Sequence, residues 1–445
     1  MAGHSHFSPA NVEEHFEFTA EARKKLLIAL VVGLALMLIG CYFLANDHGS
    51  AHEVAGAAGH AAEGHEGAKA AEHAGGHAEY HWTKRLYANL WLNSVLFTGI
   101  AVIGMFLVSV QYLAKAGWSS VIKRVPEAFP AFLPFTFVLM LVLFFLAKHD
   151  LFHWTTPGIT EKGNTNYDEV IAGKSGYLNE PFFVIRMICY FVLWYVLWRW
   201  IRKTSLAEDL DGGNEYFYKM VKIGTGFIVV LGITSSMGAW DWVMSMDPHW
   251  FSTMFGWYMF ASWHVTGWAV VALVVLLLKD QGYMKYVNEN HLHDIGKFMF
   301  AFTIFWAYVW FEQFLLIYYA GFSEETIYFF ERWNGHGGIY RPFMVLMVFF
   351  CFVFPFLALM TRDAKRTSIF MKIASCGIIV GHYLDFFQMI MPGTVGPHGG
   401  FGLLEIGTIV VFASIFGLMV NTELSKASLV APNHPFLEEA LHHDI

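Results

Sequence analysis

Long, uninterrupted runs of apolar residues dominate the hydrophobic pattern of this 445-residue chain. Each run is long enough to cross about 30 Å of hydrocarbon as an α-helix. The runs occupy residues 24–44, 86–113, 129–147, 181–201, 220–243, 251–278, 296–320, 342–360, 370–391 and 401–420. The pattern therefore predicts an all-α integral membrane protein with about ten transmembrane helices.

The composition is typical of a protein whose main solvent is lipid. Hydrophobic residues make up 56% of the chain and charged residues only 14%, which lies outside the usual range of soluble domains. The net charge of -8 and the short, interrupted basic clusters argue against a nucleic-acid partner. The first apolar run lacks a small-residue cleavage site, so we expect it to be a retained helix and not a removable signal peptide.

Basic residues predict the orientation of the helices. Lys and Arg gather in the connections on the side of the N-terminus, for example at Arg23 and Lys24, Lys123 and Arg124, and Arg362. Because cytoplasmic loops carry an excess of Lys and Arg, we expect a multi-pass protein with both termini in the cytoplasm.

Residues 46–85 form an insert rich in His, Ala and Gly between the first two helices, on the periplasmic side in this orientation. Such a composition cannot bury a core, which favours a mobile segment. The alternative is a metal site, because His73, His77 and His81 are four residues apart and could share one helix face.

Two groups of four helices carry matching residues in the same order. Ser94, Thr98 and Gly99 match Ser262, Thr266 and Gly267; Pro181 and Phe182 match Pro342 and Phe343; and Asp241 with Pro248 matches Asp385 with Pro392. Copies separated by four helices run in the same direction through the membrane. We therefore expect two repeated four-helix bundles plus two peripheral helices.

This organisation gives the expected boundaries along the chain. They are an N-terminal cytoplasmic tail (1–23), the first transmembrane helix (24–45), the insert (46–85), the first bundle (86–248), the second bundle (249–392), the tenth helix (393–420) and a C-terminal cytoplasmic tail (421–445).

Ionisable side chains inside the apolar runs are the candidate functional groups, because each is costly to hold in hydrocarbon and needs a partner or a role. They are Arg186, Asp241, His264, Glu312, His382, Asp385 and Glu405, with Asp247 at the outer interface. Thr234, Ser235 and Ser236 add hydroxyls that can hold water on the inner side. Together these residues predict a proton pathway.

His382 and Asp385 are three residues apart and therefore share a helix face, where they can form a hydrogen bond. This pairing is typical of a proton acceptor and relay, and equally of a structural ion pair that joins two helices. For Asp247, which precedes Pro248, an interfacial turn anchored by tryptophans is the favoured interpretation.

Resident cofactors are not predicted for this chain. Cys41, Cys189, Cys351 and Cys376 lie in apolar runs without a CxxC motif, which favours core packing over a zinc or iron-sulfur site. Only His264 and His382 lie well within predicted helices, whereas a bis-histidine haem arrangement needs histidines on facing helices at matching depths.

The run WDWVMSMDPHWFSTMFGWY and the later run FEQFLLIYYAGFSEETIYFFERW resemble the F subunit of alternative complex III, a bacterial quinol:cytochrome c or quinol:oxidase oxidoreductase. The resemblance covers most of 86–420. It implies membership of the polysulfide-reductase-type membrane subunits, ten helices with two four-helix bundles, and a location in the bacterial inner membrane.

The resemblance also implies partners. They are a homologous C subunit, which would oxidise menaquinol or another quinol, an iron-sulfur subunit and cytochrome c subunits that carry haem c, and a terminal oxidase as a further candidate. This chain would be a cofactor-free subunit that contributes a proton pathway and is not the redox-catalytic subunit. The alternatives are a subunit that binds quinol itself, at His382 and Asp385, or a purely structural scaffold.

Overall fold

Ten helices in the described residues are long and apolar enough to cross a membrane, as the sequence predicts. A computed structural model describes residues 12–46 and 81–444, so residues 47–80 of the insert, with His73 and His77, lie outside the described residues. The spanning helices are α1 (Ala20–Asn46), α4 (Thr83–Leu113), α6 (Leu133–Leu151), α8 (Glu180–Asp211), α9 (Asn214–Trp242), α10 (Phe255–Asp280), α11 (Glu289–Ala320), a composite of α13 (Arg341–Val348), η8 (Phe349–Val353) and α14 (Phe354–Ala358), then α16 (Ser368–Val395) and α17 (Leu403–Leu424).

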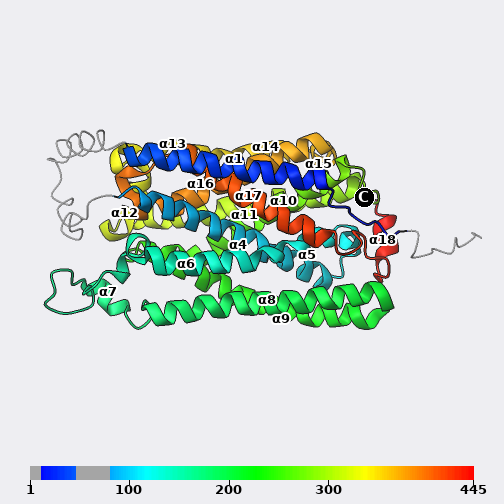
Figure 1. Cartoon of the computed structure of the whole chain (residues 1–445), viewed down its shortest axis with the longest axis horizontal. Helices are drawn as coiled ribbons and strands as arrows, with labels where there is room; N and C mark the ends of the chain where they lie inside the picture. The colour runs from blue at the N-terminus through cyan, green and yellow to red at the C-terminus, as the bar shows by residue number, and fades with distance from the viewer. Residues whose placement is uncertain (1–11, 47–80, 445) are drawn as a thin grey trace, which may run out of the picture.

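Two four-helix bundles of the same topology make up the body of the protein. In the first, α4 contacts α6 and α9, and α8 closes the ring between them. In the second, α10 contacts α11 and α16, and the composite helix closes the ring. The two peripheral helices, α1 and α17, pack against each other, and α17 lies against α4 (Figure 1).

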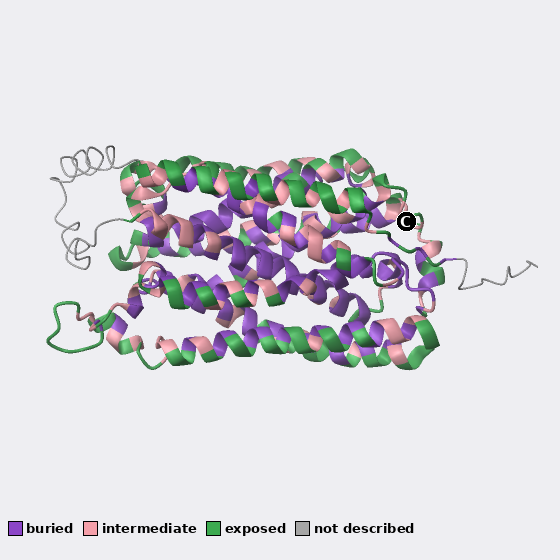
Figure 2. Ribbon diagram, viewed as in Figure 1, coloured by how far each residue is buried: buried purple, intermediate pink, exposed green. Residues whose placement is uncertain are grey.

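The centre of the protein is formed by α4, α10 and α16, most of whose residues are buried (Figure 2). Glycine allows α4 and α10 to approach closely. A β-carbon at Gly99 would lie 1.9 Å from the Trp263 ring, and one at Gly267 would lie 2.4 Å from the Ile103 side chain. Small residues serve this purpose at helix crossings in membranes.

Short helices complete the two ends. The end of the molecule that carries α7 (Glu169–Lys174) and α12 (Ser323–Trp333) lies opposite the end that carries α5 (Arg124–Ala128), α15 (Arg362–Arg366) and α18 (Leu437–Leu441) (Figure 1). We call them the α12 end and the α18 end. Gly321 separates α12 from α11, because its left-handed backbone (φ 65°) stops the helix.

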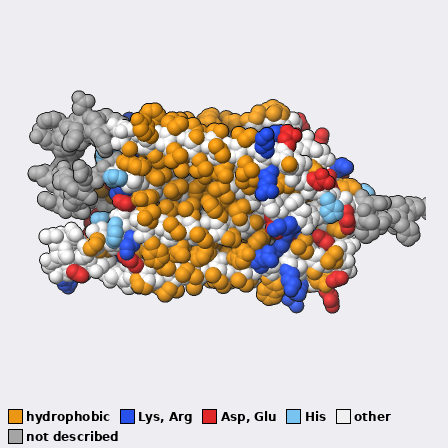
Figure 3. All heavy atoms as spheres, in the orientation of Figure 1, with side chains coloured by type: hydrophobic (Ala, Val, Ile, Leu, Met, Phe, Trp, Pro, Cys, Tyr) orange, Lys and Arg blue, Asp and Glu red, His pale blue; other side chains and the backbone are white. Residues whose placement is uncertain are grey.

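The two terminal segments meet at the α18 end. The Leu429 amide donates to the Glu14 carbonyl at 2.7 Å, and the Glu14 amide donates to Ser428 Oγ at 3.1 Å. On the face seen in Figure 3, a wide apolar belt covers the middle of the molecule, and most of the Lys and Arg side chains lie between this belt and the α18 end.

Candidate functional site

A cluster around Asp385 occupies the interior of the second bundle. Helix α16 supplies Asp385 and His382, α10 supplies Tyr258 and Ser262, and α11 supplies Trp306. All five side chains are at most 5% exposed. The spacing of three residues on one helix, which the sequence shows, places His382 Nδ1 3.3 Å from Asp385 Oδ2.

Neutral donors satisfy the Asp385 carboxyl group. Ser262 Oγ donates to Oδ2 at 2.6 Å and Trp306 Nε1 donates to the same oxygen at 3.0 Å, while the Tyr258 hydroxyl donates to Oδ1. His382 Nε2 is buried without a hydrogen-bond partner in the structure. The imidazole and the carboxyl can therefore exchange a proton with each other, and the neutral donors stabilise a carboxylate without fixing its charge.

The helix opposite this cluster contains a π-helical turn, η8 (Phe349–Val353), which brings Cys351 against it. Such turns are rare and frequently occur at functional sites. Ligand atoms of Cys351, His382 and Asp385 lie within 4.8 Å of one another, and they are the set among the described residues that could hold a metal ion. The hydrogen bonds to Asp385 account for the grouping without an ion.

Asp241, the counterpart of Asp385 in the first bundle, has a different environment. Arg186 of α8 forms two hydrogen bonds with it, Nε to Oδ2 and Nη2 to Oδ1, each 2.8 Å long, and the Tyr190 hydroxyl donates to Oδ2 at 2.9 Å. The matching prolines at the start of α8 and α13 align Arg186 with Met347. The first copy therefore neutralises its aspartate with a cation, whereas the second has an apolar residue there.

Glu405 also forms a closed ion pair. Its oxygens accept from Arg85 Nε at 2.8 Å and Nη2 at 2.9 Å, from Asn89 Nδ2 at 2.9 Å, and from the Gly402 amide at 2.7 Å, which caps α17. A buried pair of this geometry fastens α17 to α4.

His264 lies in an aromatic box and not in the Asp385 cluster. Its ring centroid is 3.9 Å from that of Phe302 and 5.4 Å from that of Phe106. Trp268 Nε1 donates to His264 Nε2 at 3.1 Å, and Nδ1 is buried without a hydrogen-bond partner. No hydrogen bond among the described residues joins His264 to His382 or Asp385.

The remaining predicted residues are dispersed. Glu312 of α11 is half-buried, and its Oε2 is enclosed without a hydrogen-bond partner. Thr234 accepts from Trp194 Nε1 at 2.9 Å, Ser235 is buried in α9, and Ser236 donates to the Gly232 carbonyl at 3.3 Å.

Asp247 interacts with residues of α12, because its charge acts on Tyr328 and Glu331. Half-buried Asp247 lies near α12, and burial together with its negative charge raises the pKa of Glu331 to about 7, against the lowering effect of Arg332. A cavity of about 20 Å³, enough for about one water molecule, is lined by Tyr258, Tyr328, Gln313, Gln388 and Arg332, among others. Its lining includes residues of α12 and also Tyr258, whose hydroxyl donates to Asp385.

Sequence analysis placed Lys123 and Arg124 in a cytoplasmic connection and missed the buried network that they form at the α18 end. Lys123 Nζ donates to Glu208 at 2.7 Å and to the Tyr112 hydroxyl at 2.6 Å, and that hydroxyl donates to the same carboxylate at 2.7 Å. Arg124 contacts Glu127, Ser205 and Asp209, and Arg202 contacts Glu127 and Glu423. In the sequence, two basic residues precede acidic ones in both 123–127 and 202–209, which indicates ion pairs but gives no indication that they are buried.

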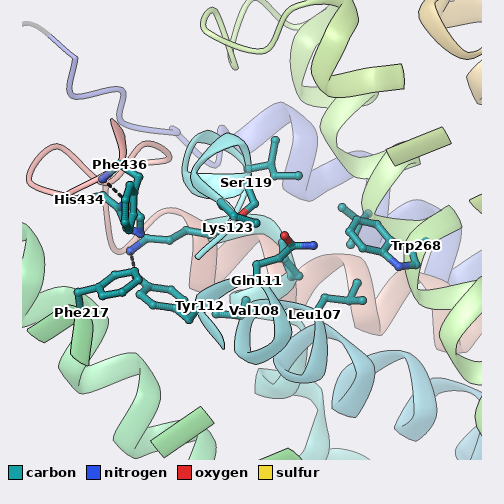
Figure 4. Close-up of a pocket in the computed structure, with 14 residues that line it drawn as sticks. Leu107, Val108, Gln111, Tyr112, Ser119, Lys123, Phe217, Trp268, His434 and Phe436 are labelled. Atoms are coloured by element: carbon teal, nitrogen blue, oxygen red, sulfur yellow. Dashed lines mark hydrogen bonds between the residues drawn. The ribbon is translucent and has the colours of Figure 1, made fainter. Parts of the chain in front are cut away.

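A second cavity of about 20 Å³ lies beside this network (Figure 4). Gln111, Lys123 and Tyr112 line it on one side, and Trp268, which donates to His264, lines it on the other (Figure 4). Burial and the charges of Lys123 and Arg124 hold the pKa of nearby His434 well below its usual value. His434 is therefore neutral, and its Nδ1 accepts from the Phe436 amide at 3.2 Å.

No family model matches the chain, and no curated protein matches it.

Proposed function

We propose that this chain is the cofactor-free F-type membrane subunit of a bacterial quinol:cytochrome c or quinol:oxidase oxidoreductase of the alternative complex III kind, and that it contributes a proton pathway. Under this proposal a homologous C subunit oxidises menaquinol or another quinol, and partner subunits carry haem c and the iron-sulfur clusters. The two bundles of equal topology and the basic residues near the α18 end support a ten-helix subunit of the bacterial inner membrane with cytoplasmic termini.

The environment of Asp385 is the observation that carries the proposal. An acid kept in the middle of a membrane protein needs a partner or a role. Asp241 has a guanidinium partner, whereas the described hydrogen-bond partners of Asp385 are two hydroxyls, one indole and one imidazole. A carboxyl group held by neutral donors and a histidine can gain and lose a proton without breaking an ion pair.

Polar groups extend from this cluster toward the α12 end. Asp385 accepts from Tyr258, which lines the water-sized cavity together with Gln313 and Gln388. The charges of Asp247 and Arg332 act on Glu331, and Arg332 lines the cavity. A carboxyl group whose pKa is about 7 can release protons at physiological pH. Protons would therefore leave the cluster toward the periplasm.

A corresponding path from the α18 end stops at His264. The Lys123 network, the second cavity and the Trp268 indole lead to that histidine. Phe302 and Phe260 pack against the His264 ring, and no hydrogen bond among the described residues joins it to His382. The proposal therefore requires a rearrangement of α10 or α11 that admits water between the two histidines.

The test is the variant Asp385→Asn in the assembled complex. We expect quinol oxidation in detergent close to that of the wild type and a large loss of proton translocation in vesicles. Glu312→Gln, which keeps the shape of the side chain and removes its charge, tests the second candidate acid. Asp280→Asn is the control, because Asp280 is a half-exposed acid whose carboxylate pairs with Lys372. Unchanged translocation in an assembled Asp385→Asn complex would refute the proposal.

For Asp241 and Glu405, the contacts support a scaffold function. The bidentate pair of Arg186 with Asp241 and that of Arg85 with Glu405 join helices, and neither acid lines a cavity described above. For the quinol-binding alternative, the cavity beside Tyr258 holds about 20 Å³, whereas small-molecule sites occupy about 300–1,000 Å³. The observed packing accommodates water there and not a quinol headgroup.

A further inference from the structure

Two adjoining grooves lie on the outside of the first bundle, away from the Asp385 cluster. The first has a volume of about 340 Å³ and runs between α6 and α8, where apolar residues line it throughout. The second has a volume of about 330 Å³ and lies between α6, α8 and α17. Pro134 and Tyr195 line both, so the two grooves form one continuous depression.

The first groove has the chemistry of an acyl-chain site. Its walls include Phe137 and Phe191, and the exposed side chains of Val192 and Val196 lie along its α8 edge. Residues exposed on a spanning helix face hydrocarbon, so this groove opens to the lipid and not to water. A flexible apolar chain can fill such a surface without satisfying any polar group.

The second groove is polar and basic. Arg199 and Lys426 contribute cations to its wall, and Thr422 contributes a hydroxyl. Glu423 is the carboxylate in the lining, and it already accepts from Lys426 at 2.6 Å and contacts Arg202 at 3.4 Å. Arg199 forms no ion pair with a described acid, and its guanidinium lies 5.7 Å from the Trp198 ring. An unpaired cation at the edge of the apolar belt favours an anion from outside the chain.

We propose that this depression binds an anionic glycerophospholipid, with one acyl chain between α6 and α8 and the phosphate at Arg199 and Lys426. Both ends of the ligand are matched, since the apolar groove lies toward the membrane interior and the cations lie at the α18 end. Basic pockets between transmembrane helices on the cytoplasmic side are a known mode of lipid headgroup binding. The site is independent of the proton pathway, and it would seat the lipid against both the first bundle and α17.

The experiment is native mass spectrometry of the full chain in its purified complex, delipidated and then titrated with phosphatidylglycerol or phosphatidylcholine. We expect tighter binding of phosphatidylglycerol, and a loss of about five-fold in affinity for each cation removed. The variant Arg199→Gln with Lys426→Gln should therefore bind it about twenty-five-fold more weakly. The matched control is Lys219→Gln with Lys222→Gln, which removes two exposed lysines of α9 at the same end.

The apolar part is tested separately. Val196→Trp fills the first groove and should displace the lipid, whereas Val229→Trp, at a similarly exposed position on α9, should not. Phosphatidylglycerol should also raise the melting temperature of the wild type by mass action, and this shift should disappear in both groove variants. Equal binding of the two lipids, unaltered binding by the groove variants, or a quinone or a partner helix found in the depression would each overturn the proposal.

Discussion

Removing the cation from the pair formed by Arg186 and Asp241 should strongly destabilise the first bundle. The two side chains are 5% and 1% exposed, and two hydrogen bonds of 2.8 Å join them. Arg186→Met leaves Asp241 with the Tyr190 hydroxyl as its described partner. Breaking a buried pair by removing one member costs about 3–5 kcal/mol, which corresponds to about a 150- to 5,000-fold change in the folding equilibrium.

The assay is reversible unfolding of the purified chain by titration of sodium dodecyl sulfate into dodecyl maltoside micelles, with helicity measured by circular dichroism. The double variant Arg186→Met with Asp241→Asn removes both charges and keeps an acceptor for Tyr190. It should recover to within about 1–2 kcal/mol of the wild type, because an uncharged pair carries little desolvation penalty. Lys203→Met, which removes an exposed cation from the same helix, should change the free energy of unfolding by less than about 0.5 kcal/mol.

Two outcomes would refute this reasoning. A loss below about 1 kcal/mol for Arg186→Met would mean that the pair is not desolvated as the structure describes. A double variant as unstable as the single one would mean that the guanidinium acts through its packing on Tyr177 and Phe182, whose ring centroids lie 3.9 and 4.2 Å from it, and not through its charge.

Three further predictions follow from other sites. Folding raises the pKa of Glu331 from 4.5 to about 7, so the folded state binds a proton more tightly than the unfolded state does. The free energy of unfolding should therefore fall as the pH rises from about 4.5 to about 7. Compared with the wild type, Glu331→Gln should be more stable by about 1–3 kcal/mol at pH 8 and equally stable at pH 4. Gly99→Ala should lower the free energy of unfolding by about 1–3 kcal/mol in the same assay, because its β-carbon would overlap Trp263 where α4 crosses α10. Gly226→Ala is the control, because its β-carbon meets no neighbour and should not destabilise the protein. Lys123→Met, which leaves a buried carboxylate without its cation, should cost about 3–5 kcal/mol and reduce the yield of folded protein, and normal yield and stability would contradict the buried network.

The spanning helices could be predicted from the sequence because hydrocarbon imposes a minimum length and forbids unpaired backbone groups. The repeat was also readable, since α4 and α10 keep the same Ser, Thr and Gly positions. Which polar side chains pair with one another could not be predicted in the same way. A membrane sequence shows which ionisable groups are present, whereas the helix rotations that pair them depend on packing across the whole bundle.

Individual residues illustrate this limit. Tyr258 and Trp306 look like ordinary aromatic core residues, and the helix contacts turn them into donors to Asp385. Lys123 and Glu208 are 85 positions apart, and the basic one matched the pattern of a cytoplasmic loop, so their burial together could not be foreseen. Glu331 lies in a short helix after Gly321, where the apolar pattern gives no indication of depth.

The enclosure of α16 has a consequence for how the protein is made. This helix carries His382 and Asp385, and a helix centre bearing such groups enters lipid at a penalty of about 2.5–3.5 kcal/mol for an unpaired charge. Its donors Tyr258, Ser262 and Trp306 belong to α10 and α11, which precede it in the chain. During N-to-C synthesis these groups are thus already in the bilayer when α16 emerges from the ribosome. The order of the helices lets the most polar span insert beside the partners that its side chains require.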